Sequence, residues 1–79
     1  MIYYYAKASG ELVRVYSRKP LALEKLQAMV GGYIEIVQNG TVCCNEDGLL
    51  KKLPKNKIHP QFVGDIIVGQ TVNGEFVGL

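Results

Sequence analysis

Cysteine and histidine, the usual zinc ligands, are scarce in this chain. Among its 79 residues there are only two cysteines and one histidine, and there is no tryptophan. A structural zinc site takes about four nitrogen, sulfur or oxygen ligands, whereas Cys43 and Cys44 are adjacent and lie far from His59 in the sequence. Successive side chains of a strand point to opposite faces, so we expect the two thiols to diverge and not to form a disulfide. The sequence predicts no metal site and no cofactor.

Net charge and long apolar runs are also limited. Nine basic and seven acidic side chains give a net charge of +2, which by itself does not indicate binding to nucleic acid or to a membrane. No apolar run approaches the roughly 18 residues of a membrane span, and the N-terminal residues lack the pattern of a secretory signal. This pattern predicts a cytoplasmic protein that does not bind membranes.

The composition is that of one folded domain. Hydrophobic residues make up 48% of the chain, and nine glycines indicate many turns. A domain of this length buries only about 60 to 65% of the surface that its unfolded chain exposes, so its core must be small. We expect a single domain over residues 1–79, without linkers or internal repeats.

One helix is predicted over residues 21–29. It follows a proline, which favours a helix start, and precedes a double glycine, which favours a helix end. The apolar positions at helical spacing are Leu23, Leu26 and Val30. A helix this short depends on packing. We therefore expect these side chains to lie against Ile34, Ile36 and part of residues 66–68.

The remaining runs predict an antiparallel sheet of hairpins. Strand-like runs occur at residues 1–7, 11–17, 33–38, 41–45 and, as two strands, 65–79. Asn39-Gly40 is the strongest hairpin signal, because both residues tolerate the positive φ of a type I′ turn, and Asn73-Gly74 is a similar signal. Gly69 is expected to mark a bulge. The order is β-β-α-β-β-loop-β-β, which predicts an α+β fold with the helix packed across one face of a small antiparallel sheet.

The loop between the second and third hairpins is basic. Its four lysines, with no acidic residue among them, are Lys51, Lys52, Lys55 and Lys57. Such a cluster would suit a phosphate-bearing partner, either a nucleic acid or a nucleotide-like ligand. The favoured interpretation is a solvated loop, because no arginine fork or aromatic RNA-binding signature accompanies the lysines.

Three runs, LEKLQAMVGGYIEIV, NEDGLLKKLPKN and GDIIVGQTV, occur in this order over residues 23–72. They resemble a family of small proteins of unknown function that bacteriophages, prophages and plasmids carry, with a Val-Gly-Gly-Tyr-Ile-Glu, Asn-Glu-x-Gly and Leu-Pro-x-Asn pattern. The resemblance implies a mobile-element origin and a location in the host cytoplasm, but it implies no chemistry. The runs TVCC and HPQFVG depart from the family pattern, so no role is inferred for residues 59–64.

Five polar positions within this pattern are candidates for a ligand-binding cluster. They are Tyr33, Glu35, Asn45, Glu46 and Asn56. The alternative is that the asparagines close turns and the other residues lie on the surface. A two-residue turn at Asn39-Gly40 would pair Glu35 with Cys44. Glu35 and Glu46 would then be diagonal neighbours, with about 7 to 8 Å between their Cα atoms. No nucleophile or metal-ligand set accompanies these carboxylates, so we expect no catalytic residues and no enzymatic activity.

The sequence thus predicts a non-enzymatic interaction protein of a phage or other mobile element that binds a host protein. One alternative is an oligomeric sponge, such as a homodimer, for a nucleotide-like or phosphate-bearing ligand. Another is weak nucleic-acid binding through the lysine loop. An outward pair among Tyr3, Tyr4 and Tyr5 is a further candidate platform for bases or a partner, although such rings also simply stabilise sheets.

Overall fold

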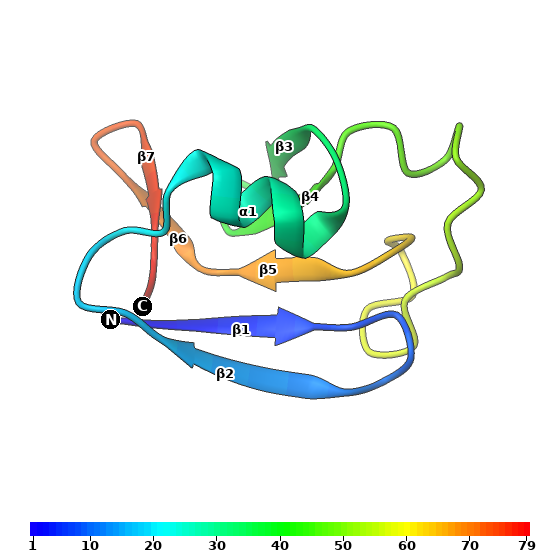
Figure 1. Cartoon of the computed structure of the whole chain (residues 1–79), viewed down its shortest axis with the longest axis horizontal. Coiled ribbons are helices and arrows are strands. Elements are labelled where there is room, and N and C mark those ends of the chain that lie inside the picture. The colour runs from blue at the N-terminus through cyan, green and yellow to red at the C-terminus, as the bar shows by residue number, and fades with distance from the viewer.

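The chain folds into a five-stranded antiparallel sheet, a separate two-stranded ribbon and one helix (Figure 1). This computed structural model describes all of residues 1–79. The elements are β1 (Ile2–Ala6), β2 (Leu12–Tyr16), α1 (Leu23–Val30), β3 (Ile34–Val37), β4 (Val42–Asn45), β5 (Ile66–Val68), β6 (Gln70–Val72) and β7 (Glu75–Val77). The α+β class expected from the sequence is confirmed. No helix in the structure is both long enough and apolar enough to span a membrane.

The late strand β5 lies at the centre of the five-stranded sheet. The strand order is β2-β1-β5-β4-β3, so β5 pairs with β1 on one side and with β4 on the other. It thereby joins the β1–β2 and β3–β4 hairpins into one sheet. Ile66 and Ile67 point to opposite faces and are both 0% exposed, so both faces of β5 are covered.

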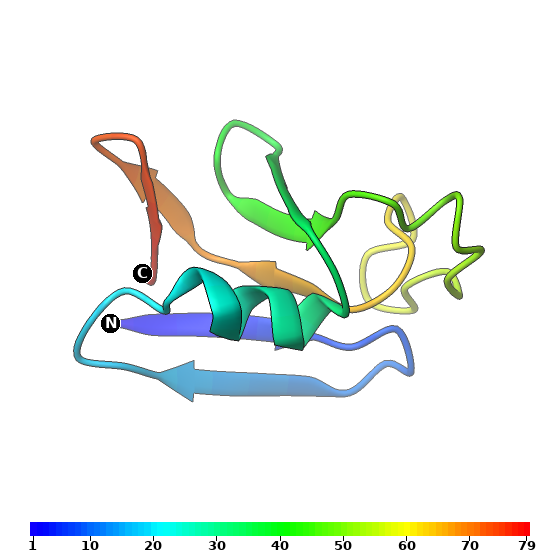
Figure 2. The same cartoon turned by 45° about the horizontal axis from the view of Figure 1, so that its top comes forward.

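The helix covers one face of this sheet, as expected (Figure 2). Leu26 and Val30 are buried in the main core cluster. Its other buried members are Tyr3, Cys43, Ile67 and Phe76. The expectation for Leu23 was wrong: its side chain is 52% exposed, because the helix begins only there and Leu21 packs against the core from the preceding segment. Ile36 is also partly exposed, because β3 is an edge strand.

A smaller apolar cluster lies on the opposite face. Its buried members are Ala6, Val42, Cys44 and Ile66. Val37 from β3 and Phe62 from the loop between β4 and β5 pack against it. The loop therefore covers part of this face of the sheet, as the helix covers the other face.

The hairpin turns explain the register. Val37 pairs with Val42 and Glu35 with Cys44, which confirms the expected pairing. Asn39 and Gly40 have positive φ as expected, but Gln38 does too, so the turn begins one residue earlier. Asn73-Gly74 forms the expected two-residue turn, with φ of 51° and 80°.

Gly69 is the point where the chain leaves the five-stranded sheet. Instead of one bulged strand, residues on its two sides form β5 and β6, and β6 pairs only with β7. A Cβ at Gly69 would lie 2.5 Å from the Val77 carbonyl oxygen, so the crossing leaves no room for a side chain. The β6–β7 ribbon then closes one end of the core, where the rings of Phe76 and Tyr3 lie 6.0 Å apart.

Gly31 ends the helix in the left-handed conformation, with φ of 82°. The amides of Gly31 and Gly32 both donate to the carbonyl oxygen of Gln27, at 2.8 and 3.0 Å. This arrangement satisfies the end of the helix and turns the chain into β3 within a few residues. The helix end expected at the double glycine is therefore confirmed, and Gly31 is the member of the pair with positive φ.

The buried position of Leu26 predicts a large loss of stability on truncation. Leu26→Ala should lower the free energy of unfolding by about 2 to 5 kcal/mol, because it leaves a cavity between helix and sheet. Leu23→Ala is the matched control, and at its exposed position it should change stability by only about 0.5 kcal/mol. Chemical denaturation measures both. Equal midpoints for Leu26→Ala and the unmodified protein would contradict the observed packing.

Gly31 should be sensitive to backbone strain alone. A Cβ there would meet no heavy atom within 4 Å, so a side chain costs only the left-handed backbone conformation. We expect Gly31→Val to lower the free energy of unfolding by about 1 to 2 kcal/mol. Gly31→Asn should lose less, because asparagine tolerates this conformation. Thermal unfolding compares the two variants, and equal losses would argue against backbone strain as the cause.

Candidate functional site

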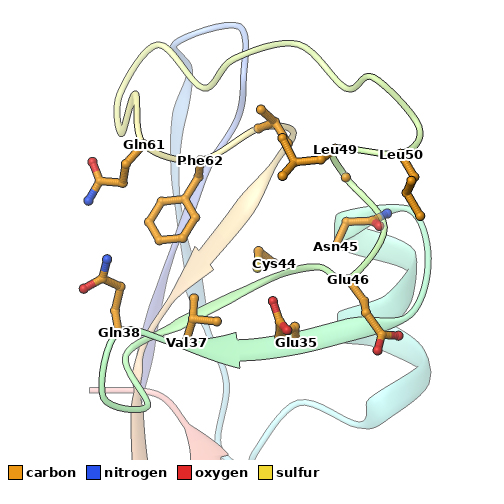
Figure 3. Close-up of a pocket in the computed structure, with 12 residues that line it drawn as sticks. Glu35, Val37, Gln38, Cys44, Asn45, Glu46, Leu49, Leu50, Gln61 and Phe62 are labelled. Carbon is orange, nitrogen blue, oxygen red and sulfur yellow. The ribbon is translucent and has the colours of Figure 1, made fainter.

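A hollow of about 500 Å³ opens on the sheet face that the helix does not cover (Figure 3). It lies between the β3–β4 hairpin and the loop that connects β4 to β5. The lining residues are Glu35, Val37, Gln38, Cys44, Asn45, Glu46, Gly48, Leu49, Leu50, Gln61, Phe62 and Val63. This volume falls within the range of known small-molecule and cofactor pockets.

The floor of the hollow is apolar and its rim is polar. Val37, Cys44 and Phe62 belong to the smaller core cluster and form part of the floor. Figure 3 shows Gln38 and Gln61 facing each other at one end, with Glu46 near the other. An apolar floor with a few polar groups around it is the usual composition of a binding pocket.

Leu49 and Leu50 are the most exposed apolar side chains that line the hollow. They are 81% and 83% exposed and lie in a series of turns directly after Gly48. Two adjacent leucines in water give up the stabilisation that each would gain on burial, about 1.5 to 3 kcal/mol. In a domain with so small a core, two large apolar side chains that stay exposed are a notable loss of possible burial. They extend the apolar surface of the hollow into solvent.

The hollow carries acidic groups and no basic one. Glu35 and Glu46 are among its lining residues, and none of the lysines is. Lys51, the nearest lysine in sequence, lies beside the end of the helix, where its Nζ is 3.5 Å from the Gly31 carbonyl oxygen. The electrostatics of the hollow therefore favour a cationic group over a phosphate.

The five candidate residues separate into two groups. Glu35, Asn45 and Glu46 line the hollow together, while Tyr33 and Asn56 lie outside it. Tyr33 is 69% exposed, and its carbonyl oxygen accepts a hydrogen bond from the Glu46 amide at 2.8 Å. Glu35 and Glu46 keep exposed side chains and are the members free to contact a ligand.

Asn45 has a structural role, in line with the alternative that the asparagines close turns. Its side chain is 6% exposed and donates from Nδ2 to the Val30 carbonyl oxygen at 3.1 Å. Its Oδ1 accepts from the Asp47 amide at 2.8 Å. Asn45 thereby ties the last carbonyl of the helix to the start of the long loop.

Asn56 holds the long loop against the sheet. It is fully buried, and its Nδ2 donates to the carbonyl oxygens of Ala6 and Gly64, both at 2.9 Å. Its Oδ1 accepts from the amides of Ile58 and His59, both at 2.9 Å. This amide has four protein partners and none of its capacity is left for a ligand.

The four lysines of the loop are exposed but do not border the hollow. Lys51 is near the helix end, as described above. Lys57 lies beside the β1–β2 turn, where its amide donates to the Ala8 carbonyl oxygen at 3.2 Å and its side chain flanks Gly10. The loop thus distributes its charges along its length.

The cysteines diverge as expected, one toward each face, and both are buried. Burial, followed by the proximity of Cys44, raises the pKa of Cys43 to about 12. Burial and then the charge of Glu35 raise the pKa of Cys44. Both thiols therefore stay protonated near neutral pH, which is the opposite of what a nucleophile needs. No three His, Cys, Asp or Glu side chains form a group that could hold a metal ion.

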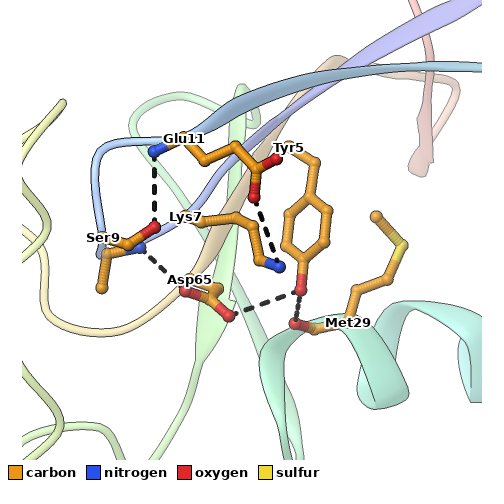
Figure 4. Close-up of polar contacts among 7 residues, drawn as sticks. Tyr5, Lys7, Ser9, Glu11, Met29 and Asp65 are labelled. Atoms are coloured by element: carbon orange, nitrogen blue, oxygen red, sulfur yellow. Dashed lines mark hydrogen bonds and ion pairs between the residues drawn. The ribbon is translucent and has the colours of Figure 1, made fainter.

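A second polar cluster, outside the hollow, joins β1, the helix and β5 (Figure 4). The Tyr5 hydroxyl lies against the Met29 carbonyl oxygen, to which it donates, and 3.4 Å from Asp65 Oδ2. Asp65 Oδ1 accepts from the Ala8 amide at 2.8 Å. Burial, followed by the charge of Asp65, raises the pKa of Tyr5. These contacts fasten the end of the helix to the sheet, a structural role for Asp65 that the sequence did not indicate.

The fold and the hollow define a small α+β domain with a helix on one sheet face and an open apolar hollow on the other. Residues 4–79 match the family model described as Domain of unknown function (DUF3846), so the chain belongs to this family. The match agrees with the expectation of a small domain of unknown function. Comparison with curated proteins and with solved structures gives no match.

The raised pKa of Cys43 predicts a loss of stability in alkali. The folded protein keeps this proton to a higher pH than the unfolded chain does, so its contribution is fully present below pH 9.0 and is lost as the pH rises toward about 12. Cys43→Ala should flatten this part of the stability profile, measured as the denaturation midpoint against pH. An unchanged slope in the variant would show that other groups cause the alkaline loss.

Proposed function

We propose that this domain is a non-enzymatic interaction module of a phage or other mobile element, and that it binds a segment of a host protein in the hollow. The observation that carries the proposal is the pair of exposed leucines, Leu49 and Leu50, beside an apolar floor. Interfaces of this kind bury a few apolar anchors at their centre and keep polar groups at the rim.

The charges of the hollow define the segment further. Glu35 and Glu46 supply two carboxylates at the rim without a basic neighbour among the lining residues. A segment with an apolar side chain next to lysine or arginine would place the apolar group on the floor and the cation at the rim. Opposite charges of this kind contribute mainly to specificity and to the association rate.

The chemistry of the hollow supports binding more than catalysis. Its one thiol, Cys44, has a raised pKa. Asn45 is held by the backbone through both ends of its amide. The two carboxylates have no nucleophile, histidine or metal-binding group beside them among the lining residues.

The test is capture of host proteins by the immobilised domain, followed by titration of each captured protein against variants. Leu49→Ser with Leu50→Ser should weaken binding by about tenfold or more per leucine. Leu23→Ser is the matched control, because Leu23 is also exposed but lies on the helix, on the other face of the sheet. Glu35→Gln with Glu46→Gln should weaken binding and reduce its dependence on salt.

Two results would contradict the proposal. One is a partner whose affinity is unchanged by the double leucine variant, because the hollow would then not be its binding site. The other is the absence of any retained protein from several bacterial hosts. Circular dichroism of each variant verifies that the fold persists.

A further inference from the structure

Besides the hollow, the long loop leaves a second part of the helix-free face open, over β1 and β2. The side chains that point to this face are Ile2, Tyr4 and Ala6 from β1 and Leu12, Arg14 and Tyr16 from β2. Phe62 packs over Ala6, while Leu12 and Tyr16 are 54% and 72% exposed. An outward pair among the first three tyrosines is not present: Tyr3 and Tyr5 pack toward the helix, and only Tyr4 points to this face.

Register places an arginine between aromatic rings on this surface. Arg14 pairs directly with Tyr4, and Tyr16 pairs with Ile2 one step along the same face. Tyr4 and Tyr16 are therefore diagonal neighbours on adjacent strands, at about 7 to 8 Å between their Cα atoms. Tyr4 also pairs with Val68 on its other side, so an apolar side chain flanks it on the same face.

Positive charge is concentrated in the same segment. The first 20 residues contain Lys7, Arg14, Arg18 and Lys19 against the single acid Glu11, a net charge of +3, so the other 59 residues together carry −1. Glu11 is already paired with Lys7, at 3.7 Å. Arg18 and Tyr16 line a shallow depression at the end of β2, together with Met1 and Ser17. None of the six outward side chains of β1 and β2 is acidic.

We infer that this face, here called the tyrosine face (Tyr4, Arg14, Tyr16 and Arg18), binds single-stranded nucleic acid. Exposed aromatic rings on an open sheet stack with unpaired bases, and arginines beside them contact the phosphates. The surface is separate from the hollow and from the lysine loop, so the inference does not depend on the proposed protein partner. A duplex is a poor ligand, because its bases are already stacked on each other.

The test is fluorescence anisotropy with labelled oligothymidine and oligouridine of about 12 nucleotides, a length that suits a single small domain. Tyr16→Ala should weaken binding by about tenfold. Tyr33→Ala is the matched control, because Tyr33 is 69% exposed and belongs to the opposite edge of the sheet. Arg14→Ser should reduce the slope of log affinity against log salt by about one.

Two further sets of variants distinguish the tyrosine face from the lysine loop and from the hollow. Replacing Lys51, Lys52, Lys55 and Lys57 with serine, or Leu49 and Leu50 with serine, should leave most of the binding in place. Three results would overturn the inference: no anisotropy change at about 50 mM salt, equal binding of a duplex of the same length, or loss of binding in the lysine variant with none in Tyr16→Ala. The last result would assign nucleic-acid binding to the lysine loop instead.

Discussion

The insertion of β5 between β1 and β4 is the interaction on which the rest of this structure depends. Isolated two-stranded hairpins are marginally stable in water, and β5 converts two of them into one sheet. Ile66 and Ile67 supply a buried side chain to each face, so both apolar clusters depend on the same strand. Without β5, neither the helix nor the long loop would have a surface to cover.

The two faces of the sheet are covered by different means, and this difference creates the candidate surfaces. On one face a helix of eight residues packs with Leu26 and Val30. On the other, a loop does so mainly through Phe62, while Asn56 donates one hydrogen bond to Ala6 of β1 and makes three more within the loop, to Gly64, Ile58 and His59. The uncovered remainder is the hollow at the β3 edge and the tyrosine face at the β2 edge.

The polar candidates show how local sequence and tertiary contacts differ in what they reveal. Glu35 and Glu46 could be placed near each other from strand register, because the Asn39-Gly40 turn sets that register, and both do line one hollow. For Asn45 and Asn56 the sequence left two alternatives open, ligand binding and turn closure. Their amides donate to the carbonyl oxygens of Val30, Ala6 and Gly64. Val30 is 15 residues from Asn45 and Ala6 is 50 residues from Asn56, so these two contacts form only in the folded chain.

The sequence by itself determined the local elements: the hairpins from their turn residues, the helix end from Gly31 and the α+β class from the order of these signals. The spacing of apolar residues and the preferences of turn residues act over a few residues, so both can be recognised from the sequence alone. Only the tertiary structure decided that β5 is central, that Leu23 faces water and Leu21 the core, and that Gly69 ends a strand. It also decided which side chains border the hollow. These outcomes depend on contacts between segments distant in sequence, whose pairing is set by total burial and not by any local pattern.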